Sequence, residues 1–170
     1  GSNSYGPSYR DGSHNDWQAN WASSEGTQDI QWNDSRCNTT TWCHYCFQKQ
    51  GTAGNGNIYL YKNGQNVATS QGGVVNATLT MGTGFRIGNG NTGWTTQYLK
   101  GKLSNFRVSH NLAHGVNGST ITVPTEPLEV DGSNTILLCC NDPNSATAAS
   151  KGSITGTSGD PTASSANPFD

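Results

Sequence analysis

The chain has 170 residues, which is enough for one domain with a two-sheet hydrophobic core. Its formal net charge is -2 and it shows no basic patch, so the composition excludes recognition of a nucleic-acid backbone. No apolar run approaches the ~20 residues of a membrane-spanning helix, so we expect no membrane insertion.

The composition favours an all-β fold. Charged residues make up only 12% of the chain, so its polarity comes mainly from Gly, Asn, Ser and Thr. A disordered chain would have fewer aromatic residues, whereas this one has 5 Trp, 6 Tyr and 4 Phe. Together with 22 Gly, these residues indicate short strands joined by turns. Because no long helical pattern interrupts them, we predict an antiparallel two-sheet sandwich of the jelly-roll type.

The N-terminal segment lacks a regular pattern. Residues 1–15 are rich in Gly, Ser, Asn and Tyr and are predicted to form an extended arm, or else a disordered leader. Trp17 and Trp21 have the spacing of a helical turn, but the residues after them do not sustain a helix, so we expect a lid. The sequence therefore predicts an arm or lid over 1–28 and a sandwich domain over 29–170.

The next part of the chain gives the clearest strand signals. Residues 39–48 have two largely apolar faces, which is typical of a strand covered on both sides. Residues 57–62 alternate, and Asn63-Gly64 predicts a type I′ turn because both central positions of that turn need a positive φ. Residues 65–70 are the predicted return strand.

A further strand is predicted within residues 98–110, with Phe106 and Val108 on one face and a bulge or bend near Gly101. Residues 134–140 are apolar and are predicted to form a short core strand.

The remaining C-terminal segments are more polar. Two prolines in residues 121–128 argue against a central strand and for a surface crossover. Residues 141–147 are predicted to form a turn and residues 150–156 a last strand, followed by a tail.

Several of these segments resemble one family. The stretch G-K-L-S-N-F-R-V at 101–108 resembles the G-x-I-x-x-F-R-V/I strand of laminin-G-like, concanavalin A-like lectin/glucanase jelly rolls. The hairpin at 60–65 and the R-I-G strand at 85–88 precede it in the same order. The W-C-H step at 42–44 is similar to the family's W-x-H-x-A strand. The resemblance covers residues 41–170.

A narrower resemblance concerns the L-L-C-C strand at 137–140 and the ending at 159–170, which contains N-P-F. Both are similar to jelly rolls in structural proteins of marine bacteriophages, cyanophages especially. The resemblance implies a non-enzymatic module of a phage virion or extracellular appendage, located on the virion surface or outside the cell. Its implied roles are capsid decoration or a fibre or appendage subunit. Its implied partners are further copies of the chain and other virion or appendage proteins.

The beginning of the chain departs from this pattern. A whole family domain opens with an apolar strand, and nothing between Gly1 and Asp29 matches it. We therefore expect a rearranged or trimmed domain, or one completed by a neighbouring chain.

The alternative function is lectin-like glycan binding for host or surface attachment. Such a site needs an exposed aromatic ring to stack on a sugar and amide groups to bind its hydroxyls. Trp94, with Asn89, Asn91 and Tyr98 nearby, is the best candidate. A packing role for Trp94 at a sheet edge is an equal alternative.

The cysteines do not predict a metal site. Cys43 and Cys46 form a C-x-x-C, but strand residues three apart point to opposite faces and no second C-x-x-C follows. Cys139 and Cys140 are likewise expected to face opposite ways. A bridge from Cys37 or Cys43 to Cys139 stays open, although reduced thiols are favoured. We expect no metal and no cofactor.

Catalysis is not expected. Glycoside hydrolysis needs two carboxylates about 5 to 9 Å apart. Glu126, Glu129 and Asp131 come nearest, but their spacing differs from the E-x-D-x-x-E of glucanases and Pro127 interrupts it. The chain is therefore predicted not to be an enzyme, with a polysaccharide hydrolase or lyase as the third class to test.

Overall fold

The computed structural model describes residues 6–10, 16–23, 26–33, 41–50, 57–69, 87, 99, 101–111, 119–155 and 161–170. All regular structure in these residues is β-strand, and every strand pair is antiparallel, which confirms the predicted fold class. Nowhere in these ranges is there a helix of the length and hydropathy that a membrane span requires.

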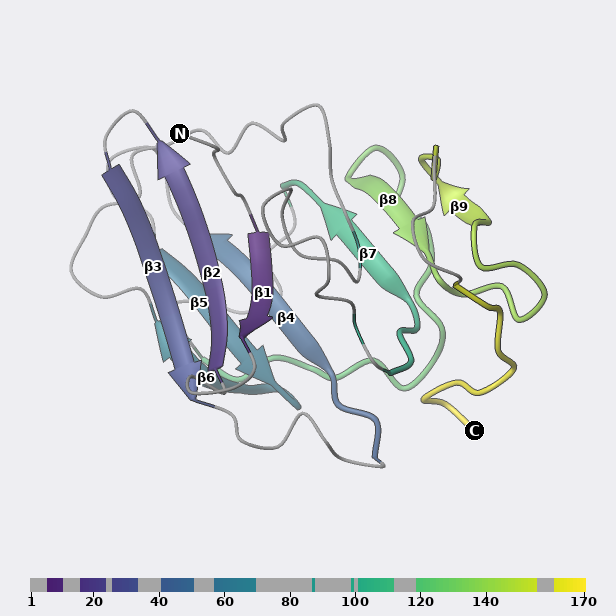
Figure 1. Cartoon of the computed structure of the whole chain (residues 1–170), viewed down its shortest axis with the longest axis horizontal. Helices are drawn as coiled ribbons and strands as arrows, with labels where there is room; N and C mark the ends of the chain where they lie inside the picture. Colours follow the sequence, from purple (N-terminus) through teal and green to yellow (C-terminus); the bar gives the residue numbers. More distant parts are fainter. Residues whose placement is uncertain are drawn as a thin grey trace. The chain divides into compact units, whose positions relative to one another are not determined.

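The chain divides into two compact units. The first contains Gly1–Leu99 and Ala113–Val123, and the second contains Lys100–Leu112 and Pro124–Asp170. The strands of the described residues form three-stranded sheets in the orders β1-β2-β3, β4-β5-β6 and β7-β8-β9 (Figure 1). The first two sheets belong to the first unit, and the third sheet belongs to the second unit.

The first sheet contains β1 (Gly6–Arg10), β2 (Asp16–Ser23) and β3 (Gly26–Asn33), with β2 in the middle. Strands therefore occupy much of the range 1–28, where the sequence predicted an arm or lid, and residue 28 itself lies within β3. In β2, Trp17, Ala19 and Trp21 alternate with polar residues, a strand period that the predicted lid, based on the four-residue spacing of Trp17 and Trp21, did not take into account. The three strands are otherwise rich in Ser, Gln and Asn. Their structure comes from pairing with one another. The division of the chain at residue 28 stays a prediction.

The second sheet contains β4 (Tyr45–Gln50), β5 (Asn57–Lys62) and β6 (Gln65–Thr69), with β5 in the middle. The backbone of β6 also approaches that of β3. The turn between β5 and β6 has φ of 48° at Asn63 and 82° at Gly64, as a type I′ turn needs. The hairpin predicted from the Asn-Gly pair is thus confirmed.

Strand β4 begins at Tyr45, later than the predicted residue 39. Backbone pairing nevertheless reaches one residue further, because Asn63 N–H donates to the carbonyl of His44 at 2.9 Å. The N–H of His44 in turn donates to Asn63 Oδ1, also at 2.9 Å. Asn63 therefore joins the hairpin turn to the start of β4 through both its backbone and its side chain.

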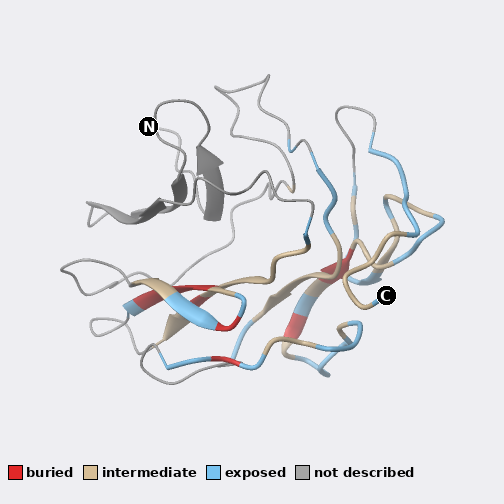
Figure 2. Cartoon of the chain, turned by 90° about the horizontal axis from the view of Figure 1, so that it is seen from below, coloured by how far each residue is buried: buried red, intermediate tan, exposed pale blue. Residues whose placement is uncertain are grey.

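The β4–β6 sheet is covered on both faces. On one side Ile58 and Leu60 are buried, with 1% and 0% of their surface exposed. On the other side Tyr59 and Tyr61 pack with Ile121. This double coverage was predicted for β4, and the structure shows it most completely for β5 (Figure 2). The partly buried side chains that complete the two clusters are Tyr45, Phe47, Val67 and Ala68 on the first side and Cys46 on the second.

The crossover after residue 119 packs against the hairpin turn. Ile121 N–H donates to the carbonyl of Gly64 at 2.9 Å, and the Ile121 side chain is only 7% exposed. The structure has no strand in 121–128, as its prolines predicted, but it buries one end of a segment that the sequence placed at the surface.

The third sheet contains β7 (Phe106–Ser109), β8 (Thr135–Cys139) and β9 (Ala149–Lys151), with β8 in the middle. The predicted strand after Ser104 is confirmed. The sequence predicted a bulge or bend near Gly101, and the chain bends there, which confirms the second alternative. It is not a bulge in the ladder, because residues 101–105 precede the strand. The register shift occurs at Val108/Ser109 instead. The R-I-G strand at 85–88 lies outside the described residues, apart from residue 87.

Candidate functional site

The residues predicted to bind a glycan, Asn89, Asn91, Trp94 and Tyr98, lie outside the described residues. Their mutual arrangement therefore stays a prediction. The site considered below comes from the described residues of the second unit, where polar groups gather at one end of a sheet.

The start of β7 and the end of β8 meet at this end of the sheet. Asn105 N–H donates to the carbonyl of Cys140 at 3.0 Å, which extends the ladder beyond both strands. Asn105 has a φ of 53° and Cys140 a φ of 61°, both in the left-handed region. Non-glycine residues are uncommon there, although Asn tolerates it better than most. We call Ser104, Asn105, Cys140 and residues 141–148 the polar end.

The Asn105 side chain fixes the neighbouring backbone. Its Oδ1 accepts a hydrogen bond from Leu128 N–H at 2.9 Å, and its Nδ2 donates to Ser104 Oγ at 2.9 Å. The sequence pattern assigned Phe106 and Val108 to one face of this strand and gave no role to Asn105. The tolerance of Asn for positive φ was the one local signal of a special position, because Leu128 is far away in the sequence.

Residues 141–148 form a turn whose side chains bond to its own backbone. Asp142 Oδ1 accepts from Asn144 N–H at 2.8 Å. Ser145 Oγ accepts from the N–H groups of Thr147 and Ala148 at 3.3 and 3.1 Å. Short side chains that satisfy nearby backbone donors in this way hold a turn in one conformation. The predicted turn at 141–147 is confirmed.

The base of this turn is attached to the sheet. Asn141 Nδ2 donates to Ser150 Oγ at 3.1 Å, and Ser150 belongs to β9. The turn 141–148 is therefore closed across its base as well as ordered at its tip. It presents mainly neutral hydrogen-bonding groups, with Asp142 as its one charged residue.

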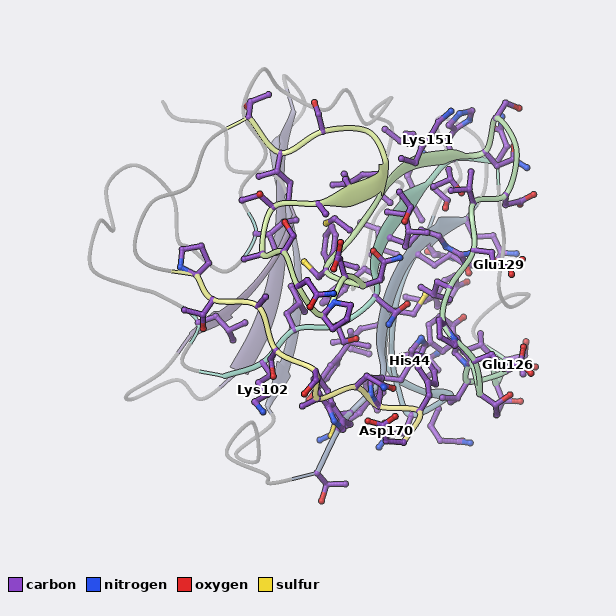
Figure 3. The ribbon with its side chains drawn as sticks, turned by 90° about the vertical axis from the view of Figure 1, so that its right-hand side faces the viewer. His44, Lys102, Glu126, Glu129, Lys151 and Asp170 are labelled. Carbon is purple, nitrogen blue, oxygen red and sulfur yellow. The ribbon has the colours of Figure 1, made fainter. Side chains whose placement is uncertain are left out.

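Of the three acidic residues nearest to the glucanase pattern, Asp131 forms local hydrogen bonds. Asp131 Oδ2 accepts from Asn134 Nδ2 at 3.3 Å, and Thr135 Oγ1 accepts from Asp131 N–H at 2.9 Å. Glu126 and Glu129 are exposed, and Figure 3 shows both on the same outer stretch of chain. Within the described ranges, His, Cys, Asp and Glu nowhere gather in threes that could hold a metal ion.

The C-x-x-C cysteines have separate surroundings. Cys46 packs against the cluster of Tyr59 and Tyr61, while the Cys43 thiol donates to the carbonyl of Thr41 at 3.9 Å. Burial, followed by the effects of Cys46 and Tyr59, raises the pKa of Tyr61 above its ordinary value. Cys46 is thus a packing residue of the β4–β6 sheet, and Cys43 bonds to nearby backbone.

The second cysteine pair differs from the prediction. Cys139 and Cys140 were expected to face opposite ways, but their sulfurs lie 3.6 Å apart in a thiol–thiol hydrogen bond. The left-handed φ of Cys140 is the reason, because it breaks the strand alternation immediately after β8 ends. Both residues are free cysteines in the structure, and the redox state of the chain stays a prediction. Cys37 lies outside the described residues.

The comparisons with known proteins give one match. The family model described as the concanavalin A-like lectin/glucanases superfamily matches residues 1–113. No curated protein and no solved structure matches the chain. The match includes the segments at 60–65 and 101–108 that resembled this family. The match begins at residue 1, so the predicted beginning of the resemblance at residue 41 was wrong. The match ends at residue 113, and the resemblance of residues 114–170 stays a prediction.

Proposed function

Because the chain belongs to the concanavalin A-like lectin/glucanase superfamily, we propose that it is a non-enzymatic surface module that works by protein–protein assembly. The family is built on an antiparallel β-sandwich, in agreement with the all-strand structure of the described residues. Since a fold hosts many functions, the proposal depends on a particular surface. That surface is the polar end.

The observation that supports assembly is the order of the turn 141–148. Its hydrogen bonds to Asp142, Ser145 and Ser150 fix its conformation before any partner arrives. Ordering loops and side chains is one of the main costs of association, so an ordered turn loses less on binding. Asn144 and Thr147 are exposed on it and offer neutral donors and acceptors to a partner. The expected partners are further copies of the chain or other proteins of the same particle.

The proposed location is a phage virion or an extracellular appendage, as a capsid-decoration, fibre or appendage subunit. Its support is the resemblance of the L-L-C-C strand and the N-P-F ending to phage structural proteins. In the structure this ending is an ordered turn. Asn167 Oδ1 accepts from Phe169 N–H at 2.7 Å, and Asn167 Nδ2 donates to Asp170 Oδ1 at 2.6 Å. These hydrogen bonds within the turn are typical of an ordered segment, whereas the last residues of most domains are poorly ordered.

The alternative is a lectin-like module that binds glycan for attachment to a host or surface. The family description includes lectins, and Trp94 with Tyr98 is the predicted stacking site. Among side chains that the structure describes, every Trp, Tyr and Phe ring is buried or half-buried, from Trp42 to Phe169. The described surface thus favours assembly, and the glycan alternative depends on the residues around Trp94.

A charge placed in the turn tests assembly. Asn144→Arg would put a bulky cation on the neutral turn, and we expect it to reduce the amount of the chain that co-purifies with its particle by roughly tenfold or more, since a buried unpaired charge costs several kcal/mol. Ser133→Arg is the matched control. Ser133 is also an exposed neutral residue but precedes β8, so it lies at the other end of that strand. Equal incorporation of both variants would contradict the proposal.

A glycan array distinguishes the assembly function from the glycan-binding alternative. Assembly predicts no specific glycan signal from the intact chain. A signal that disappears in Trp94→Ala, with incorporation of Asn144→Arg unchanged, would replace assembly by glycan binding. Incubation with marine polysaccharides should release no new chain ends if the module is non-enzymatic.

A further inference from the structure

Cys140 belongs to the polar end, but the proposed assembly function is argued from the turn 141–148 and does not use the thiols of Cys139 and Cys140. Cys139 is the last residue of β8 and is fully buried, whereas Cys140 is half-buried at the polar end. Adjacent residues in a regular strand point to opposite faces, so their sulfurs stay well apart. Here they are 3.6 Å apart. The chain therefore brings two thiols together at a position where regular geometry would separate them.

The backbone holds this arrangement in place. Cys139 is fixed by its pairing with Phe106 in β7, and Cys140 by the hydrogen bond that its carbonyl accepts from Asn105 N–H. A left-handed φ costs a residue with a Cβ about 1–2 kcal/mol. The surrounding contacts must supply that energy at Cys140, since its φ is 61°. The two thiols are thus preorganised as a pair.

The two thiols are not equivalent. The hydrogen bond between the two thiols lowers the pKa of Cys140, against an opposing effect of burial. The same hydrogen bond, followed by burial, raises the pKa of Cys139. Because the thiolate is the reactive form, Cys140 is the thiol that reacts first, and it is also the more accessible one. Cys139 keeps its proton and is available for the second step.

We propose that Cys139 and Cys140 form a reversible oxidation site, at which a low-molecular-weight disulfide converts the two thiols into a vicinal disulfide. In the first step the Cys140 thiolate attacks one sulfur of the small disulfide, forms a mixed disulfide and releases one thiolate. In the second step the Cys139 sulfur loses its proton to solvent and attacks Cys140 Sγ, which releases the second small thiolate. The protein loses two hydrogens, and the small disulfide is reduced to two thiols.

The geometry predicts a weak bond. Consecutive Cα atoms are about 3.8 Å apart, whereas disulfides prefer about 4.4–6.8 Å. A strained disulfide is more easily reduced than a structural one. The pair is therefore expected to open again with mild reductant, so the site is suited to reversible modification rather than to stabilisation of the fold.

Peptide mapping of the full chain tests the site directly. The reduced protein is incubated with oxidised glutathione, quenched with an alkylating reagent and digested with trypsin. The peptide 108–151 contains Cys139 and Cys140 as its only cysteines, and the peptide 37–49 contains the other three. We expect 108–151 to lose two hydrogens and to escape alkylation, and to regain both thiols with dithiothreitol. The peptide 37–49 serves as the internal control.

Two substitutions test the roles of Cys139 and Cys140 in the two steps, and a third serves as the control. In Cys139→Ser the second step is blocked, so one glutathione should remain on Cys140. In Cys140→Ser the modification of 108–151 should fall by roughly tenfold or more, because the reactive thiolate is gone. Cys43→Ser should leave the yield on 108–151 unchanged. Circular dichroism of each variant checks that the strands are retained.

Two results would overturn the proposal. One is full alkylation of 108–151 in the wild-type chain under conditions that modify 37–49, a result that depends on no variant. The other is glutathione on Cys139 of Cys140→Ser at the wild-type rate, which would show that the pairing confers no reactivity on Cys140.

Discussion

The β4–β6 and β7–β9 sheets have the same size and strand order but use their residues differently. In β5, four consecutive side chains are buried, and the hairpin that follows is regular apart from one register shift. In β8 the burial is interrupted, because Ile136 is 44% exposed between buried Thr135 and Leu138. Among the described residues of the second unit, positive φ values occur at Asn105, Asn111, Gly132, Cys140 and Gly152. The comparison indicates that the first sheet is specialised for packing, whereas the second sheet has unusual backbone geometry at both ends of its strands.

The largest expected difference between the sheets is in core packing. Leu60→Ala in β5 should lower the free energy of unfolding by about 2–5 kcal/mol, because it removes a fully buried side chain and leaves a cavity. The matched change in β8, Ile136→Ala, should cost less than about 1 kcal/mol. Urea denaturation of the two variants measures both. Equal losses would mean that β8 is packed as tightly as β5.

The hairpin turn of the β4–β6 sheet should be the next most sensitive position. Gly64→Ala would place its Cβ 2.7 Å from the Ile121 carbonyl oxygen and 3.2 Å from Val123 Cγ2, at a φ of 82°. We expect a loss of about 2–3 kcal/mol in the free energy of unfolding.

Substitutions of two glycines in the second unit distinguish the two causes of that loss, which are the positive φ and the close contacts of the new Cβ. Gly132→Ala keeps the positive φ, here 45°, without any neighbour within 4 Å, so it should cost about 1–2 kcal/mol. Gly101→Ala meets neither obstacle and should be close to neutral. If Gly64→Ala lowers the free energy of unfolding by no more than Gly132→Ala does, the close packing of Ile121 on the turn does not contribute to the loss.

The polar end of the β7–β9 sheet should respond to Asn105. Asn105→Ala removes the acceptor of Leu128 N–H and puts alanine at a φ of 53°, so we expect a loss of about 1–2 kcal/mol. Asn105→Asp retains the acceptor and should lose less, and Asn105→Gly removes the side chain but tolerates the φ. Thermal unfolding of the three variants shows how much of the loss comes from the missing hydrogen bond and how much from backbone strain. An Asp variant as unstable as the Ala variant would contradict the role of Oδ1.

The smallest expected effect concerns Tyr61 and pH. Burial raises its pKa, so the folded chain retains a proton that the unfolded chain loses above about pH 10. Stability should therefore be complete below that pH and fall as the pH rises further, by at most about 1.4 kcal/mol per pH unit. Tyr61→Phe should remove this part of the pH dependence and cost little at neutral pH, since no described residue bonds to the buried Tyr61 hydroxyl. Denaturation midpoints of the two proteins between pH 8 and about 11 measure the difference. If the denaturation midpoints of the two proteins change with pH in parallel, Tyr61 does not cause the loss of stability at high pH.

The sequence predicted the features that depend on near neighbours. The alternation over 57–62 and the Asn63-Gly64 pair gave the β5–β6 hairpin and its turn type, because both are set within a few residues. The apolar run at 134–140 likewise predicted β8.

The sequence missed the features that depend on distant partners. Strand β1 has no hydrophobic period and is defined by its pairing with β2. In β2, Trp17, Ala19 and Trp21 do alternate, but the prediction used only the helical spacing of the two tryptophans, and the pairing of β2 with β3 was not foreseen. The role of Asn105 depends on Leu128, and the approach of the Cys139 and Cys140 sulfurs depends on one left-handed φ that no local pattern announced. The candidate glycan residues around Trp94 stay a prediction from composition and spacing.

Hydrogen exchange of the chain, alone and within its purified particle, tests the assembly function most directly. The account predicts slower exchange in the particle for backbone amides of the turn 141–148, with little change in 57–62, which is already protected within a sheet. Unchanged exchange at 141–148 in the particle, together with protection around Trp94 when glycan is added, would contradict it.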